Sequence, residues 1–331
     1  MNKKWIIYIV LIVVAFVLIV VFSKNIYFWL SNQLWKILLL AAVFGGGCWD
    51  ASEARKTGHS KATAINRFDV LKRTIRLHIS PCPNDTFMFD ALVNGRIDCG
   101  ELTFEVAYYD IEELNRRAEA GETDVSKISY ALLPEIQSRY TLLDSGSALG
   151  RGNGPVFVAR QGTPPDSIRR VAVPGMHTTA NALMSRLYPS ITQKKPVLFS
   201  EIAPAVARGE YDAGVLIHEG RFVYRKLGLE LVADLGELWE SRTGLPLPLG
   251  AIVARRTLPE ELRCEIERLL RTSIEYAFAH REESRTYIKE HARELDDRVI
   301  DHHIDFFVNS YSLSLGDEGR RAVRELTGVE V

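Results

Sequence analysis

The sequence lacks an excess of either charge, paired cysteines and a glycine-rich phosphate loop. Lysine and arginine number 41 and aspartate and glutamate 42 among 331 residues, so the composition predicts no nucleic-acid partner. The four cysteines form no C-x-x-C pair, which supports neither a zinc knuckle nor a disulfide framework. The glycines at 45–47 match neither the Walker nor the Rossmann spacing. The cysteine pattern fits a reducing compartment.

Long apolar runs are confined to the first 50 residues. One uninterrupted run and a second, less pure one span residues 5–44, and each is close to the roughly 20 residues that cross a bilayer. The segment 51–73 that follows is a polar, mostly basic linker, and basic flanks are typical of the cytoplasmic side. We therefore expect one or two transmembrane helices that anchor a cytoplasmic domain to the inner membrane. The alternative is a mis-called extension, with the true start near residue 74.

From Thr74 onward, short apolar segments that favour strands alternate with segments that favour helices. This alternation predicts an α/β fold with mostly parallel sheets. The last part of the chain is helical instead, and Thr257, with a glutamate three residues later, is typical of a helix start. The predicted strands are Ile75–Ile79, Leu102–Tyr108, Val125–Ser129, Pro155–Ala159, Val171–Val173, Val197–Phe199, Ala213–Ile217, Leu229–Val232 and Leu249–Ala254.

Two segments marked by glycine and proline divide this α/β region. Gly152–Pro155 and Leu245–Gly250 each lead into an apolar strand, at about the places where the chain would pass from one lobe to the other. We therefore expect one lobe of residues 74–155 and 251–331 and a second lobe of residues 156–250. Two crossing strands predict a cleft that closes by hinging. The alternative is that these glycines and prolines only mark ordinary loops.

The segment Ser80–Phe87, with the sequence SPCPNDTF, directly follows the predicted strand Ile75–Ile79. Its prolines forbid regular structure, and Asn84 and Asp85 are typical of a helix start. A polar helix start at the end of a strand is where open α/β folds bind small anions, so we expect both side chains at a binding site. Cys82 has no identifiable partner base, and a small buried thiol is its commoner role.

Two further pairs of residues are candidates for anion binding. Thr178 and Thr179 begin a predicted helix after a Pro-Gly turn, where their hydroxyl and N–H groups suit a carboxylate or phosphate. Plain helix capping is the alternative. Lys127 and Ser129 are two residues apart on a predicted strand and so face the same way. This pair is either an anion clamp or part of an exposed edge strand.

His218 stands at the carboxyl end of a buried strand, which is the ligand edge of an open sheet. An imidazole there titrates near neutral pH and suits proton abstraction. A structural, hydrogen-bonded histidine is the alternative. His302 and His303 are adjacent on a predicted helix and point in different directions, so we expect no metal site from them.

Together, these motifs resemble those of the 1,4-dihydroxy-6-naphthoate synthase family of menaquinone biosynthesis. The similarity is carried by Ser80–Phe87, Gly175–Ala180 and Leu216–Phe222, in the family's order, and it covers residues 74–328. The preceding residues have no counterpart in the family. The resemblance implies a type II periplasmic-binding-protein-like fold with two lobes and an interlobe cleft, here preceded by N-terminal hydrophobic helices.

The resemblance also implies an activity and a site. His218 would be the catalytic base, and the substrate, cyclic dehypoxanthine futalosine, would contact Lys127, Ser129, Thr178 and Thr179. The reaction would cleave a carbon–carbon bond with neither cofactor nor metal. Two alternatives stay open. One is a solute-binding protein that is tethered to the membrane beside a transporter. The other is chorismate dehydratase, an enzyme of the same pathway with the same fold.

Overall fold

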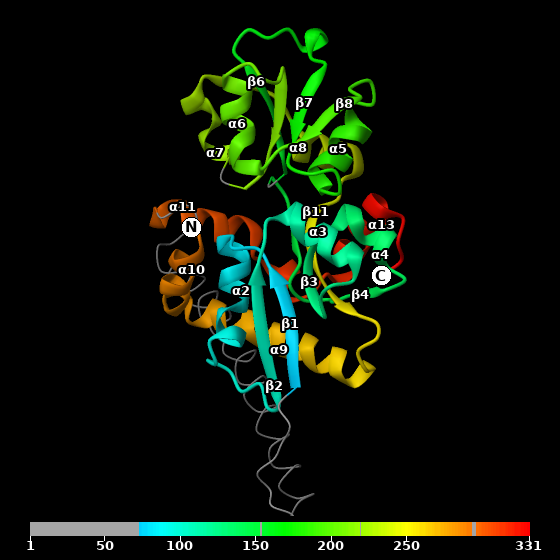
Figure 1. Cartoon of the computed structure of the whole chain (residues 1–331), viewed down its shortest axis with the longest axis vertical. Coiled ribbons are helices and arrows are strands. Elements are labelled where there is room, and N and C mark those ends of the chain that lie inside the picture. Colours follow the sequence, from blue (N-terminus) through cyan, green and yellow to red (C-terminus); the bar gives the residue numbers. More distant parts are fainter. Residues whose placement is uncertain (1–72, 153, 219, 293–295) are drawn as a thin grey trace, which may run out of the picture. The chain divides into compact units, whose positions relative to one another are not determined.

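The computed structural model describes residues 73–331 apart from 153, 219 and 293–295. The expected membrane segment of residues 1–50 and nearly all of the predicted linker therefore lie outside the described residues. Within the described ranges, no helix is both long and apolar enough to cross a bilayer. The same part of the chain is built on two β-sheets, whose strands are the arrows in Figure 1.

The first sheet combines strands from both ends of the described region. They are β1 (Arg73–Ile79), β2 (Leu102–Tyr108), β3 (Val125–Ser129), β4 (Tyr140–Leu142), β5 (Ala148–Gly150) and β11 (Leu247–Arg255). The strand order is β2-β1-β3-β11-β4, and β5 pairs with the first half of β11. β1 is parallel to β2 and β3, whereas β11 is antiparallel to β3, β4 and β5.

Helices cover both faces of this sheet. The helices on one face are α2 (Pro83–Val93), α9 (Glu260–Ala279), α10 (Arg285–His291) and α11 (Asp297–Phe307). The other face has α3 (Ile111–Ala120), α4 (Leu133–Ile136) and α13 (Gly316–Thr327), and α12 (Ser310–Leu313) joins α11 to α13. Ile252 of β11 packs in the first core and Val253 in the second. Successive side chains of a strand point to opposite faces, so one buried strand serves both cores.

The second sheet is formed by the middle of the chain. Its strands are β6 (Val156–Arg160), β7 (Arg170–Val173), β8 (Gln193–Pro196), β9 (Ala213–Leu216) and β10 (Leu229–Asp234). The strand order is β10-β6-β9-β7-β8. β7 is parallel to β8 and β9, whereas β6 is antiparallel to β9 and β10.

This sheet also lies between helices, as Figure 1 shows. The helices are α5 (Thr179–Leu187) and α8 (Leu235–Thr243) on one face, α6 (Phe199–Ala207) on the other, and α7 (Gly220–Val223) after β9. A glycine lets α6 approach closely: a Cβ at Gly214 would stand 2.5 Å from Ile202 Cγ2 and 2.9 Å from Val206 Cγ2. The close packing fixes the carboxyl end of β9, which leads to His218.

The prediction of mostly parallel sheets is wrong. β6 and β11 are antiparallel to all their partners in the described residues. Both strands enter their sheet from the other half of the fold. They enter at the edge where the parallel strands end, so they must run against those strands. The alternation of strands and helices along the sequence does not contain this information, because it depends on which half the chain comes from.

Several element boundaries also differ from the sequence expectation. The predicted strand Val197–Phe199 is absent from this described stretch, because β8 ends at Pro196 and α6 begins at Phe199. A short apolar run fits a strand or a buried helix equally well. β11 begins at Leu247, where the backbone pairs with Gly150 in the first sheet while the side chain packs in the core of the second.

Candidate active site

A cavity of about 90 Å³ lies between the two sheets. Strand residues of the first sheet and residues next to strands of the second sheet line it, and apolar groups such as Ile217, Leu249 and Phe307 form much of its wall. The polar lining residues are Ser80, Asn84, Lys127, Ser129, Thr178, Thr179, His218 and Arg221. The cavity thus brings together every site residue predicted from the sequence except Asp85.

Asp85 lies behind the cavity wall. Its fully buried carboxylate accepts hydrogen bonds from Ser80 N at 3.1 Å, Ser80 Oγ at 2.7 Å and Asn84 Nδ2 at 2.8 Å. It also forms an ion pair with Lys127, whose Nζ is 2.7 Å away. Helix α2 begins at Pro83, which lacks the N–H that a first helical residue leaves unpaired. This helix start directs the Asp85 carboxylate back toward Ser80. Because the same carboxylate also pairs with Lys127, Asp85 holds the Lys127 ammonium in place.

Lys127 reaches the cavity across a glycine of the neighbouring strand. Ser129 of β3 pairs with Gly250 of β11, and a Cβ at Gly250 would stand 2.7 Å from Lys127 Cε. The ammonium group is therefore held between Asp85 and the cavity. The Ser129 hydroxyl accepts a hydrogen bond from Asn115 Nδ2 at 3.0 Å, which orients it beside Lys127. The two residues form a buried cation and hydroxyl on one strand face.

The two threonines at the start of α5 are engaged within the protein. Thr178 caps the helix: its hydroxyl accepts from Asn181 N at 3.2 Å and donates to Gly175 O at 2.8 Å. The Thr179 hydroxyl donates to Leu249 O at 2.9 Å and so joins the helix to β11. The helix start therefore offers a ligand the positive end of the helix dipole, which favours an anion.

His218 enters the cavity in a strained backbone conformation. Among the described non-glycine residues, it alone has a positive φ, 52°. Such conformations cost about 1–3 kcal/mol and cluster at functional sites. Phe199 packs edge-on against the imidazole, with the ring centroids 5.1 Å apart. The Sγ atom of Cys82 lies 3.9 Å from His218 Nε2, so the thiol that had no evident partner in the sequence faces this ring.

His303 lies directly behind His218. The two rings are stacked, with centroids 5.9 Å apart and an interplanar angle of 11°. His303 is buried, and its Nε2 is 3.1 Å from Asn84 Oδ1. Burial holds the pKa of His303 well below 6.5, and the nearby His218 and Lys127 lower it further, so His303 is neutral near pH 7. Its neighbour His302 is exposed, as the helical spacing predicts.

The buried histidine makes stability depend on pH. The unfolded chain protonates His303 below about pH 6.5, whereas the folded chain does not, so the unfolded state binds more protons in acid. We expect the free energy of unfolding to fall below pH 6.5 by up to about 1.4 kcal/mol per pH unit for this proton. Urea unfolding at a series of pH values measures the slope. His303→Gln should make it shallower, and an unchanged slope would contradict the assignment.

Arg221 is a second cation at the cavity. Its guanidinium lies 3.1 Å from Asp234 Oδ2 and donates to Gly154 O, and Phe306 packs under it at 5.0 Å from the ring centroid. Burial lowers the pKa of Arg221, and Asp234 opposes that shift. Because arginine keeps its charge in proteins, the cavity has a fixed positive group opposite Lys127.

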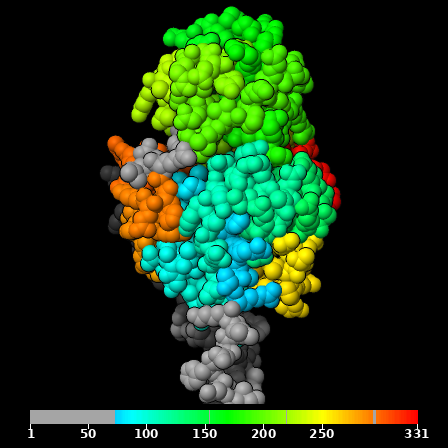
Figure 2. Space-filling view, in the orientation of Figure 1, coloured from blue at the N-terminus to red at the C-terminus, as the bar shows by residue number. Residues whose placement is uncertain are grey.

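A carboxylate of the first half binds the loop before α5 in the second half. Glu112 of α3 accepts hydrogen bonds from Met176 N at 2.9 Å and His177 N at 3.2 Å, and its Oε1 is 3.0 Å from His177 Nδ1. Figure 2 shows the surface where residues around α3, in cyan, meet the green second half. Gly175 provides the space, because a Cβ there would stand 2.2 Å from Glu112 Oε2.

Removing this carboxylate should open the cavity. Hydrogen bonds to a charged group are worth about 1.5–3 kcal/mol, so we expect Glu112→Ala to shift the closed population about tenfold or more. Small-angle scattering should give a larger radius of gyration. The control is Glu325→Ala, which removes an exposed ion pair with Arg186 and should change little. Equal scattering curves for Glu112→Ala and the unmodified chain would contradict this role.

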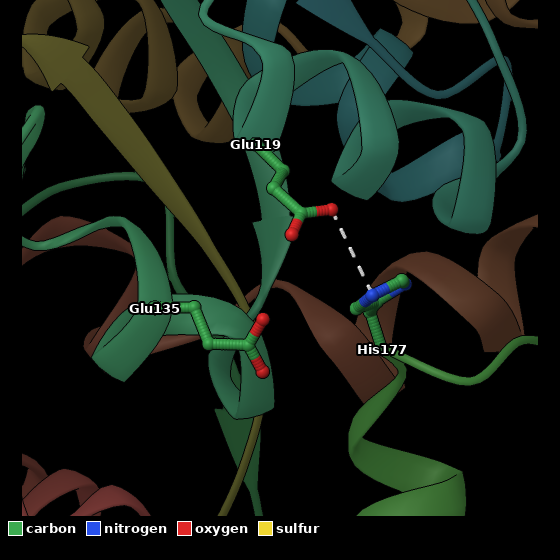
Figure 3. Close-up of side chains that lie close together, drawn as sticks. All are labelled: Glu119, Glu135 and His177. Atoms are coloured by element: carbon green, nitrogen blue, oxygen red, sulfur yellow. Dashed lines mark ion pairs between the residues drawn. The ribbon is translucent and has the colours of Figure 1, made fainter.

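Figure 3 shows Glu119, Glu135 and His177 close together beside this contact. One ligand atom from each lies within 4.8 Å of the others, so the three are the group that could hold a cation among the described residues. In the structure, Glu119 Oε2 pairs with His177 Nε2 at 3.8 Å. Glu135 is exposed. The contact between the two halves accounts for this cluster of side chains.

Three functional candidates escaped the sequence analysis. Arg221 lies in the motif Leu216–Phe222, but an arginine there does not by itself indicate a function. It becomes a candidate because its location after β9 places it at the cavity. His303 is 85 residues downstream of His218 on another element. Glu112 gives no functional signal in the sequence. Each depends on contacts between distant segments, which no local pattern encodes.

A cavity that joins two α/β halves, with crossing strands between them, is typical of the class of proteins whose fold resembles that of periplasmic binding proteins. The chain belongs to the menaquinone biosynthesis family, which it matches over residues 75–329. It is 50% identical to the 1,4-dihydroxy-6-naphthoate synthase of Thermus thermophilus over 252 residues, which are 76% of this chain and 92% of the relative. It is 45% identical to the Streptomyces coelicolor enzyme of the same name over 259 residues, 76% and 91% of the two chains.

Solved structures support the same fold. Protein AF1704 from Archaeoglobus fulgidus superposes with a TM-score of 0.71 at 35% identity, over 76% of this chain and 95% of that one. The CA3427 gene product of Candida albicans, described as having the generic periplasmic binding protein fold, gives a TM-score of 0.61 at 11% identity, over 77% and 89% of the chains. The second likeness concerns the fold alone.

Proposed function

We propose that this protein is a 1,4-dihydroxy-6-naphthoate synthase, which cleaves a carbon–carbon bond of cyclic dehypoxanthine futalosine without a cofactor. The observation that carries the proposal is the placement of His218 in the cavity between the two halves. Its support is the identity of 45–50% to two enzymes of that name over most of their length. The apolar lining suits an aromatic ring system, and the polar groups converge from both sides.

In this mechanism His218 is the general base. It removes a proton that the substrate's ketone makes acidic, and the resulting enolate drives ring opening and expulsion of the sugar-derived fragment. Aromatisation of the product then makes the release favourable. A positioned base accelerates a reaction by about 10²–10⁴-fold. The closed cavity supplies the rest of the rate acceleration by orienting the substrate and excluding water.

The substrate carboxylate has a defined place in this proposal. Lys127 and the start of α5 at Thr178 lie on the cavity wall, and both favour an anion. Ser129 stands beside Lys127 and is oriented by Asn115. Asn84 joins the cavity to the buried carboxylate of Asp85. The charges thus hold the acid group while the apolar wall holds the rings.

A direct assay tests the proposal. The purified full chain is incubated with cyclic dehypoxanthine futalosine, and the product is followed by its absorbance and identified by mass. We expect 1,4-dihydroxy-6-naphthoate from this substrate and no product from chorismate, the substrate of chorismate dehydratase. A folded chain that binds the first compound without converting it would instead be a solute-binding protein.

We further propose that residues 5–44 attach the protein to the inner membrane with its catalytic part in the cytoplasm. The support is the apolar run followed by a basic segment. The natively expressed chain should sediment with membranes and be released by detergent but not by high salt. We propose two lobes for the catalytic part, residues 74–155 with 251–331 and residues 156–250.

A further inference from the structure

A chain of buried polar groups connects helix α11 to the cavity. It begins at His303, passes through the amide of Asn84 to the carboxylate of Asp85, and ends at Lys127. The distances between the hydrogen-bonding atoms are 3.1, 2.8 and 2.7 Å along the chain. All four residues are buried, so each depends on its neighbours for hydrogen bonds. A continuous set of hydrogen bonds therefore connects His303 to Lys127.

The chemistry of this chain fixes the protonation of His303. An ionised carboxylate only accepts hydrogen bonds, so the amide nitrogen of Asn84 must face Asp85. The amide oxygen consequently faces His303, and Nε2 of His303 must carry the hydrogen. Because burial keeps His303 neutral, its Nδ1 is unprotonated. The histidine has one tautomer, and the ring orientation follows from it.

The same ring supports the catalytic base. His303 stacks on one side of His218, nearly parallel at 11°, while Phe199 packs edge-on against the His218 ring. His218 itself has the strained backbone conformation, and these neighbours hold its ring in place. A neutral ring beside His218 also adds no charge repulsion when His218 takes up a proton. Among the described residues, the charged or titratable groups that act on the pair include Lys127, His302 and Cys82.

We propose that His303 is a positioning residue that aligns the His218 base and the Lys127 cation with one another. One arm is the ring stack, which sets the direction of the His218 imidazole. The other arm is the hydrogen-bond chain, which sets the Lys127 ammonium. His303 itself is not among the residues lining the cavity, so it acts through these two groups. This inference rests on the proposed function and deepens it.

Two substitutions separate the arms. His303→Phe keeps a ring against His218 but removes the donor to Asn84, so Lys127 loses its alignment and KM should rise about tenfold or more. His303→Gln places an amide N–H near the position of Nε2 but removes the ring. Its kcat should fall by up to about 10²-fold, the scale of a misplacement of about 1 Å. His303→Leu removes both arms and should change both parameters.

The control is Arg298→Gln on the same helix, which alters a side chain that is 93% exposed and should leave kcat and KM unchanged. Urea unfolding of every variant shows whether activity merely follows stability. The role is overturned if the three His303 variants keep both wild-type parameters, or if kcat and KM change together in proportion to lost stability. An unmodified chain that makes no product overturns the proposed function, and this inference with it. An active chain with unaffected His303 variants overturns the inference alone.

Discussion

Substitution of His218 should abolish turnover while leaving the fold intact. Loss of a positioned base lowers kcat by about 10²–10⁴-fold, and no other described imidazole lines the cavity to replace it. The choice of substituent matters, because the backbone at His218 has a φ of 52°. Asparagine tolerates this left-handed conformation better than most residues, whereas alanine is strained there. His218→Asn therefore removes the base with the least disturbance of the turn.

The measurement is product formation under saturating substrate, with the unfolding midpoint of each variant as a control for folding. Cys82→Ser is the matched variant, because it alters the neighbour of His218 Nε2 and keeps the imidazole. It should retain most of the activity if His218 is the base. Near-wild-type turnover by His218→Asn, or equal losses in both variants, would end the proposed mechanism.

Local patterns predicted which residues lie together around the cavity better than they predicted the directions of the strands. Some of the residues that line the cavity follow predicted strands or begin predicted helices, as His218 and Thr178 do. The position of a residue at the end of a strand is a local property, and parallel strands end at the same edge. The direction of β6 and β11 is not local, because it depends on the path of the chain between the halves.

The roles of individual side chains were harder to predict than their places. Asp85 was predicted to contact the ligand, but the carboxylate turns back to Ser80 and pairs with Lys127. Thr178 and Thr179 line the cavity, yet their hydroxyl groups donate to backbone carbonyls. Which partner a polar group takes depends on residues far along the chain. A single sequence gives its residue type and approximate location, and the packed structure gives its partner.

Breaking the ion pair between Lys127 and Asp85 should have the largest effect on stability. Their side chains are 6% and 0% exposed, and Nζ and Oδ1 are 2.7 Å apart. Removing one partner of a buried pair leaves an uncompensated charge and costs about 3–5 kcal/mol. We therefore expect Lys127→Met and Asp85→Asn each to lower the free energy of unfolding by that amount. Both should also lose activity, since Lys127 holds the substrate carboxylate in the proposed mechanism.

The double variant gives the decisive comparison. Without either charge, neither of these two side chains needs a counter-ion, so Lys127→Met with Asp85→Asn should be more stable than the sum of the single changes predicts. The coupling should be several kcal/mol because the pair is desolvated. The exposed pair of Glu265 and Arg268 is the control, and Glu265→Gln should cost less than about 1 kcal/mol. Additive losses for Lys127 and Asp85 would show that the pair is not coupled. An inactive double variant of native stability would show that this charge pair serves the site more than the fold.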